Sequence, residues 1–150
     1  MRPSEVRQRI LDDHQLIQVM ISEIRDLALR IQAGEECLSG KLRERGRNLY
    51  ECFCQHIDLE DVILVGALRN TDSWGEERAE ELRSEHREQR EVLTYLLERL
   101  LDPTQQQILM VHDLLNFTAW ICDDIRHEEE TLLHEDLLQD DVTGVHVNTG

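Results

Sequence analysis

Histidine and acidic residues interrupt the apolar pattern of residues 53–68, a stretch that the spacing predicts to be helical. His56 and Glu60 lie four residues apart, a spacing that places both side chains on one face of a helix, one turn above the other. The other residues on that face, at steps of three or four, are Leu49, Phe53, Ile63 and Ala67. Because burying polar groups without partners is costly, a bound metal ion is the expected partner of this pair.

Three further helical patterns carry the same kind of interruption. His14 lies on a stripe of isoleucine and alanine, and His86 lies on a stripe that is mainly leucine. The histidine and acidic residues on the four stripes are His14, His56, Glu60, His86, Asp124 and Glu128. Imidazole and carboxylate groups suit iron, manganese or zinc, and six of them match a two-metal site with bridging carboxylates inside a helix bundle.

Each of these residues also has a purely structural explanation. A lone histidine in a core is usually hydrogen-bonded, and Glu60 could pair with Arg90 on the next helix. Asp124 and Glu128 belong to an acid-rich run, most of which must be solvated. The positions of the polar residues along their helices separate the two explanations.

Four long helical patterns position these residues. The first starts after Ser4 and ends at a C-cap glycine, Gly34, and the second covers about residues 41–69. The third covers about residues 74–101, after a capping box of Ser73 and Glu76, and the fourth starts at Asp102-Pro103 and ends near Leu138. Long helices with short links predict an all-α, up-down-up-down four-helix bundle over residues 1–138, with residues 139–150 as a frayed tail.

The polar residues lie at one level of that bundle. His14 and His86 follow the starts of their helices by about ten and twelve residues. Glu60 and Glu128 precede the ends of theirs by about nine and ten residues. In an up-down-up-down bundle these four helix ends meet at one pole, so all four side chains lie roughly 13 to 18 Å from it at 1.5 Å per residue. The common level favours a shared site over independent structural groups.

Composition limits the classes of partner. The chain has 150 residues, 4% aromatic residues and a net charge of −16, which favour one all-α domain and argue against nucleic acid and anionic membranes as partners. No signal peptide or long apolar run is present, so we expect a cytoplasmic protein without a membrane span. The cysteines fit no zinc or redox motif and are expected to be free thiols: Cys37, Cys52, Cys54 and Cys122.

From about Ile10 to Leu133 the chain resembles the hemerythrin-like (HHE cation-binding) family. Four segments carry the resemblance: Asp12-Asp13-His14, His56-Ile57-Asp58-Leu59-Glu60-Asp61, Glu85-His86 and Asp124-Ile125-Arg126-His127-Glu128-Glu129. The resemblance implies a centre of two non-haem iron ions, with manganese or zinc as other options. Carried over by position, Glu60 and Glu128 would bridge the metals. His14 and His56 would bind one iron, and His86 and residue 124 would bind the other.

The sequence departs from that family at two places. The positions four residues before and after His86 hold Leu82 and Arg90 rather than a second histidine. In the last helix Asp124 stands where the family has a histidine. His127, about 60° round the helix from Asp124, is the alternative ligand. We favour Asp124 because it shares the stripe with Glu128.

The departures bear on the expected function. A carboxylate in place of an imidazole adds negative charge and stabilises ferric iron. We therefore expect binding of O2, NO or peroxide for redox chemistry or sensing rather than O2 storage. If the protein is an enzyme, it is a di-iron oxidoreductase that acts with O2 or peroxide. The alternative is a metal-free, acidic helical adaptor or regulator that binds a basic protein.

Further positions have expected places around the site. Possible hydrogen-bond acceptors near the ligands are Asp12, Asp13, Asp58 and Glu85. The histidines outside the stripes are expected on the surface: His112, His134 and His146. The sequence leaves the oligomeric state open, with a homodimer as one option.

Overall fold

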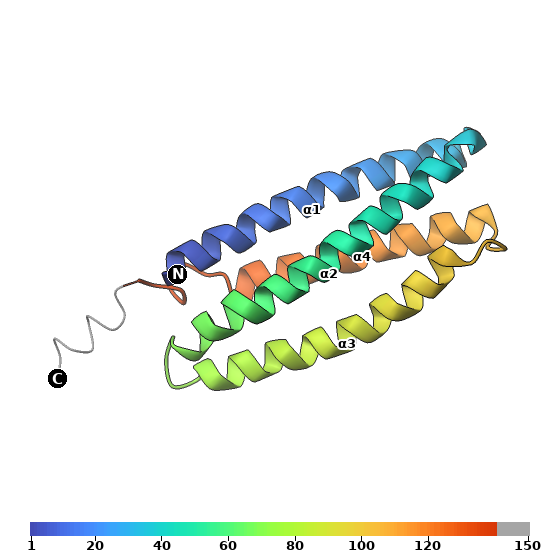
Figure 1. Cartoon of the computed structure of the whole chain (residues 1–150). Coiled ribbons are helices and arrows are strands. Elements are labelled where there is room, and N and C mark those ends of the chain that lie inside the picture. Colours follow the sequence, from blue (N-terminus) through green and yellow to red (C-terminus); the bar gives the residue numbers. More distant parts are fainter. Residues whose placement is uncertain (141–150) are drawn as a thin grey trace, which may run out of the picture.

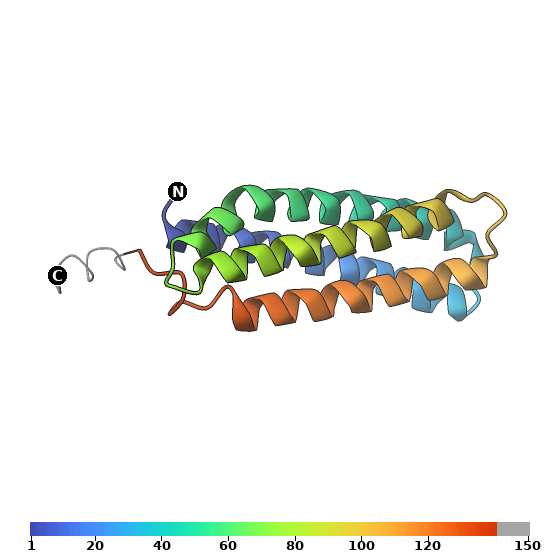
Figure 2. The same cartoon turned by 90° about the horizontal axis from the view of Figure 1, so that it is seen from below.

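The computed structural model describes residues 1–140, which form four long helices and no strand. In chain order the elements are α1 (Pro3–Gln32), the short 3-10 helix η1 (Glu36–Leu38), α2 (Ser39–Arg69), α3 (Gly75–Leu101) and α4 (Gln107–Thr131). Successive helices run in opposite directions along one long axis (Figure 1), and α3 and α4 lie in front when the bundle is seen from below (Figure 2). The predicted all-α, up-down-up-down bundle is confirmed.

The first helix ends as its sequence predicts. Gly34, with φ 112°, adopts the left-handed conformation that favours glycine, and its N–H donates to the carbonyl of Ile31 at 3.0 Å. The turn between α2 and α3 needs another glycine for a steric reason. A Cβ on Gly75 would clash with the backbone carbonyl oxygens of Leu68 and Arg69. These glycines bring consecutive helices back alongside one another.

The predicted capping box of the third helix and the predicted start of the fourth are wrong. The backbone N–H of Trp74, the residue before α3, donates to Asp72 at 2.8 Å, and Ser73 makes no capping bond to the helix. Asp102 accepts from the N–H and hydroxyl of Thr104, at 2.9 and 2.6 Å, and so stabilises a local turn instead of capping a helix. The fourth helix therefore starts at Gln107 rather than at Asp102-Pro103.

The predicted end of the fourth helix is also wrong. The helix stops at Thr131, and the chain continues to residue 140 in turns. These turns bury Leu133 and Leu138 and bring Asp140 to the start of α1, where its carboxylate accepts from the N–H and hydroxyl of Ser4 at 2.8 and 2.6 Å. Of the predicted tail, residues 141–150 lie outside the described part of the chain, and so does His146.

The apolar stripes of the helices form the core with small shifts from the predicted seams. The stripe of α1 is buried at every predicted position. On α2, Leu64 and Leu68 are buried, whereas Ile63 and Ala67 are only partly buried. The shift follows from helix geometry, because a seam read in steps of three and four drifts by about 20° per seven residues on a straight α-helix.

Polar side chains divide the core into two apolar clusters. The larger cluster extends from the polar layer to the end formed by the α1–α2 and α3–α4 connections, and the smaller lies at the end that carries the N-terminus. On α1, Ile10 belongs to the smaller cluster and Ile17 to the larger, with His14 between them. On α2, Glu60 lies in the same way between Ile57 and Leu64. The predicted common level of the polar residues is therefore a layer across the bundle.

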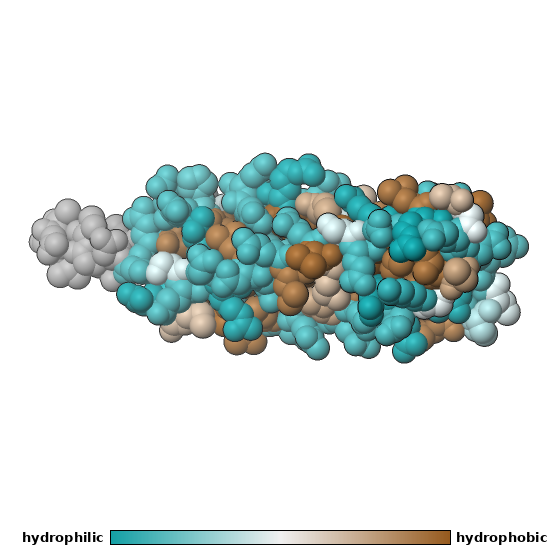
Figure 3. Space-filling view, turned by 90° about the horizontal axis from the view of Figure 1, so that it is seen from above, coloured by the Kyte–Doolittle hydropathy of each residue, from teal (hydrophilic) through white to brown (hydrophobic). Residues whose placement is uncertain are grey.

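The surface is mainly polar. Figure 3 shows a largely hydrophilic face on which apolar side chains are scattered. Among the described residues, no helix is both long and apolar enough to cross a bilayer. The four cysteines are free thiols, and His112 and His134 are exposed, as expected.

Candidate metal centre

Four buried side chains from three helices converge in the polar layer. His14 comes from α1, His56 and Glu60 come from α2, and Glu128 comes from α4. Each offers one ligand atom, and these atoms all lie within 4.8 Å of one another. All four residues are 1–3% exposed, and among residues 1–140 no other group of three or more such side chains gathers this closely. These four residues are called the inner tetrad below.

The ligand atoms of the inner tetrad lack hydrogen bonds. Nε2 of His14 lies 3.0 Å from Oε1 of Glu128, and Nε2 of His56 lies 3.4 Å from Oε2 of Glu60. These distances suit ion pairs, but none of the four atoms has a partner of hydrogen-bonding geometry among the described residues. Buried polar atoms are rarely left this way, and four of them within 4.8 Å of one another could hold a metal ion.

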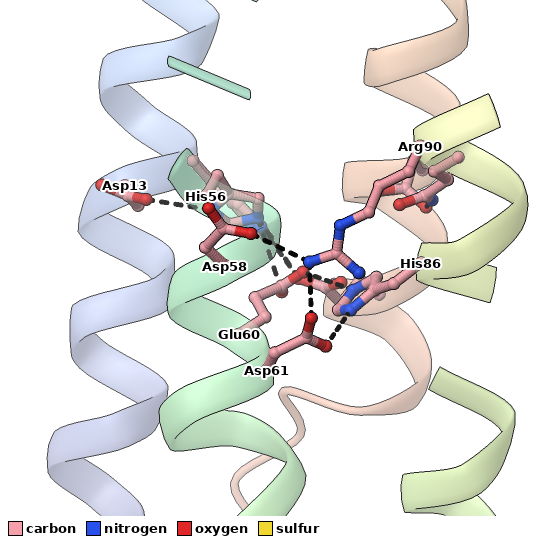
Figure 4. Close-up of polar contacts among 11 residues, drawn as sticks. Asp13, His56, Asp58, Glu60, Asp61, His86 and Arg90 are labelled. Atoms are coloured by element: carbon pink, nitrogen blue, oxygen red, sulfur yellow. Dashed lines mark hydrogen bonds and ion pairs between the residues drawn. The ribbon is translucent and has the colours of Figure 1, made fainter. Parts of the chain in front are cut away.

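Each buried histidine is held from its outer side by a carboxylate. Nδ1 of His14 lies 2.8 Å from Glu129, and Nδ1 of His56 lies 2.9 Å from Asp13. Figure 4 shows the second contact, between α1 and α2. A proton on Nδ1 that bonds the carboxylate leaves Nε2 with its lone pair facing inward. Metal-binding histidines typically have this arrangement.

His86 on α3 repeats the arrangement one helix away. Its Nδ1 lies 2.6 Å from Oδ1 of Asp61, and Arg90 donates to the other oxygen of that carboxylate at 2.6 Å (Figure 4). Its Nε2 lies 3.1 Å from Oε1 of Glu60. Glu60 therefore directs one oxygen toward His56 and the other toward His86, the geometry of a carboxylate that bridges two positions.

The remaining predicted ligands are on α4, and the structure separates them. Asp124 is half-buried and accepts a hydrogen bond from Nε2 of Gln89 at 2.8 Å. His127 is exposed. Both line a groove of about 360 Å³ together with Gln89 and other residues of α3 and α4. Asp124 is thus the more buried of the two, and neither residue belongs to the inner tetrad.

The carboxylates of the layer affect one another's protonation. Burial and the negative charge of Glu60 raise the pKa of Glu128 well above its ordinary value. The same two causes raise the pKa of Asp124 to about 6. Burial would raise the pKa of Glu60 too, but its close contacts with Glu128, His56 and His86 lower it. Carboxylates are therefore crowded in a dry layer, and a cation there would offset their repulsion.

The same surroundings shift the pKa values of the imidazoles in different directions. Burial and the neighbouring His56 lower the pKa of His14. Burial alone would lower the pKa of His56, but the hydrogen bond to Asp13 and the nearby carboxylate of Glu60 raise it to about 9. Imidazole nitrogens and carboxylate oxygens together are donors that iron, manganese and zinc accept. The donor set, its burial and its unpartnered atoms fit such a cation.

Only one of the three supporting carboxylates was predicted from the sequence. Asp13 was expected, but Asp61 and Glu129 were not, although each directly follows a glutamate of the inner tetrad. The next residue on a helix lies about 100° round, so it faces the neighbouring helix and can reach its histidine. Arg90 is not the partner of Glu60, because it binds Asp58 and Asp61 instead.

Comparison with known protein families gives a match that covers most of the chain. The model of the family described as "Hemerythrin HHE cation binding domain" matches residues 6–135. No curated protein and no solved structure gives a significant match. The matched range includes all three histidines of the layer, their supporting carboxylates and Asp124.

Proposed function

This chain belongs to the hemerythrin HHE cation-binding family, and on that premise we propose that it is a non-haem di-iron protein that binds O2, NO or peroxide. The observation that carries the proposal is the set of unpartnered ligand atoms of the inner tetrad, which face one point inside a buried layer of the described chain. Manganese or zinc would suit the same donors.

The proposed ligand set divides between two positions. His14 and His56 would bind one cation, while His86 and Asp124 would bind the other. Glu60 and Glu128 would bridge the two, and the two oxygens of Glu60, which face different histidines, support that role. The carboxylates Glu129 and Asp13 would hold His14 and His56 in the tautomer whose Nε2 is free, and Asp61 would orient the ring of His86.

Iron bound in this layer would supply electrons and an open coordination position for O2 or peroxide. The chain itself contributes a dry environment, because apolar clusters lie on both sides of the layer. Asp124, in place of an imidazole, adds negative charge and favours the oxidised metal. That charge supports redox turnover or sensing as the role of the centre rather than O2 storage.

The net charge of −16 is the observation that favours a second candidate, a metal-free adaptor that binds a basic protein. Metal analysis and the visible spectrum of protein expressed with iron distinguish the two. About two irons per chain with charge-transfer absorption support the di-iron protein. A colourless, metal-free chain that is equally stable with and without added iron supports the adaptor and contradicts the di-iron proposal.

A further inference from the structure

The two halves of the proposed centre differ in whether their ligand atoms are free. On one side, Nε2 of His14 and of His56 lack hydrogen-bond partners among residues 1–140, as do Oε2 of Glu60 and Oε1 of Glu128. A cation entering this position displaces no protein hydrogen bond. All four ligand atoms already lie within 4.8 Å of one another, so little movement is needed to bind it.

On the other side, the two ligands that do not bridge already have protein partners. Nε2 of His86 is hydrogen-bonded to Oε1 of Glu60 at 3.1 Å. Oδ1 of Asp124 is hydrogen-bonded to Nε2 of Gln89 at 2.8 Å. A cation must compete with both contacts before it gains these ligands. A hydrogen bond to a charged group is among the stronger ones in proteins, so the competition weakens binding on this side.

Gln89 is placed to decide how freely Asp124 can turn inward. Both residues line the groove between α3 and α4, so the Asp124 side of the centre lies next to a surface groove. Oε1 of Gln89 is buried and lacks a hydrogen-bond partner among the described residues, so the side chain is anchored through its contact with Asp124. The members of the inner tetrad and His86 are all 1–3% exposed and none of them lines this groove, so the groove reaches the proposed centre at Asp124.

We propose that the centre takes up its two cations unequally. The first cation binds tightly at the inner tetrad, and the second binds more weakly beside His86 and Asp124, from the α3–α4 groove, when Gln89 releases Asp124. Gln89 is thus a positioning residue that sets the affinity of the second position. This inference rests on the two-metal centre proposed above and adds an order of loading and a residue that controls it.

Titration of the metal-free protein with Co²⁺, followed by calorimetry and visible absorption, tests the order of loading. The expected result is two binding events, the second at least roughly tenfold weaker, the equivalent of one hydrogen bond to a charged group. Gln89→Leu removes the donor to Asp124. It should strengthen the second event by about the same factor and leave the first unchanged, which a general loss of structure would not do.

A second Gln–Asp contact in the same protein provides the matched control. Gln105 donates to Asp113 at 2.6 Å and also has a buried Oε1 without a partner in the described chain, but its contact lies outside the polar layer. Gln105→Leu should change neither event. Two equal events, or a second event that Gln89→Leu leaves unchanged, would overturn the inference while the two-metal centre stands. A single event in both the wild type and Gln89→Leu, or none, would overturn the two-metal centre itself.

Discussion

Nδ1 of His86 lies 2.6 Å from Oδ1 of Asp61, a contact between α3 and α2 that fixes the imidazole from its outer side. Asp61→Asn keeps the size of the side chain and removes its charge, so the proton on Nδ1 is held less firmly. We expect metal affinity at the His86 position to fall about 10–100-fold. Competition with a chelator, read separately for the two binding events, measures the loss.

Asp58→Asn is the control for that variant. Asp58 accepts from the same guanidinium of Arg90, at 2.9 Å, but contacts no buried histidine. Asp58→Asn should leave the affinities of both metal positions unchanged. Equal losses of metal affinity in the Asp58 and Asp61 variants would show that the contacts of Arg90, rather than the orientation of His86, set the affinity.

Glu60→Ala should remove both cations rather than one. The two oxygens of Glu60 face His56 and His86, so its loss takes a ligand from each position. Metal content per chain and the visible spectrum report the result. Glu130→Ala, at an exposed position in the same acid-rich run as Glu128, should retain both cations. An unchanged metal content in Glu60→Ala would contradict the bridging role.

Removal of metal should destabilise the fold, most strongly at the end that carries the smaller apolar cluster. Cations that bind only the native state at a thousand times their Kd stabilise it by about 4 kcal/mol. Thermal melting with and without a chelator measures this. Hydrogen exchange should then show the larger loss of protection near Ile10 and Leu64, beyond the layer, rather than near Ile24. A melting temperature independent of chelator would favour the metal-free adaptor.

Two substitutions on α4 compare the candidate ligands directly. Asp124→His should raise the reduction potential of the centre, because a neutral imidazole replaces a carboxylate and the reduced metal becomes relatively more stable. His127→Ala should alter neither metal content nor potential, since His127 is exposed. The reverse pattern, with metal lost in His127→Ala and no effect of Asp124→His, would assign the ligand to His127.

Two glycines on α2 give opposite expectations for the same substitution. A Cβ on Gly66 would meet nothing within 4 Å, so Gly66→Ala should stabilise the protein by about 0.4–1 kcal/mol. A Cβ on Gly46 would lie 2.7 Å from Cδ2 of Leu114, a fully buried residue of α4. Gly46→Ala should therefore destabilise by about 1 kcal/mol through overpacking. Denaturant unfolding measures both, and a gain in both would show that α2 and α4 can separate without cost.

The sequence by itself determined the helices and the level of the polar layer. Hydrophobic periodicity is a local property, so the stripes of His14, His56, Glu60 and His86 could be read directly, and the constant rise of a helix fixed their depth. The antiparallel order of the helices followed from their short connections. For these reasons the bundle and the buried level of these residues were predictable without coordinates.

Only the tertiary structure decided what contacts the ligands from outside. Asp61 and Glu129 support histidines of neighbouring helices, whereas Asp12 bonds to Gln8 on its own helix. Which acid reaches an imidazole depends on the rotation of two helices about their axes and on side-chain rotamers. Neither quantity is encoded in the spacing of residues along one helix.

The contact between Gln89 and Asp124 has the same origin, because residues on two different helices meet only after the bundle has packed. The start of the fourth helix shows, for a single residue, what the sequence alone leaves undecided. The carboxylate of Asp102 could cap a helix or close a turn, and its bonds to Thr104 select the turn. Local sequence permits both arrangements, and the length needed to connect α3 and α4 in the packed bundle decides between them.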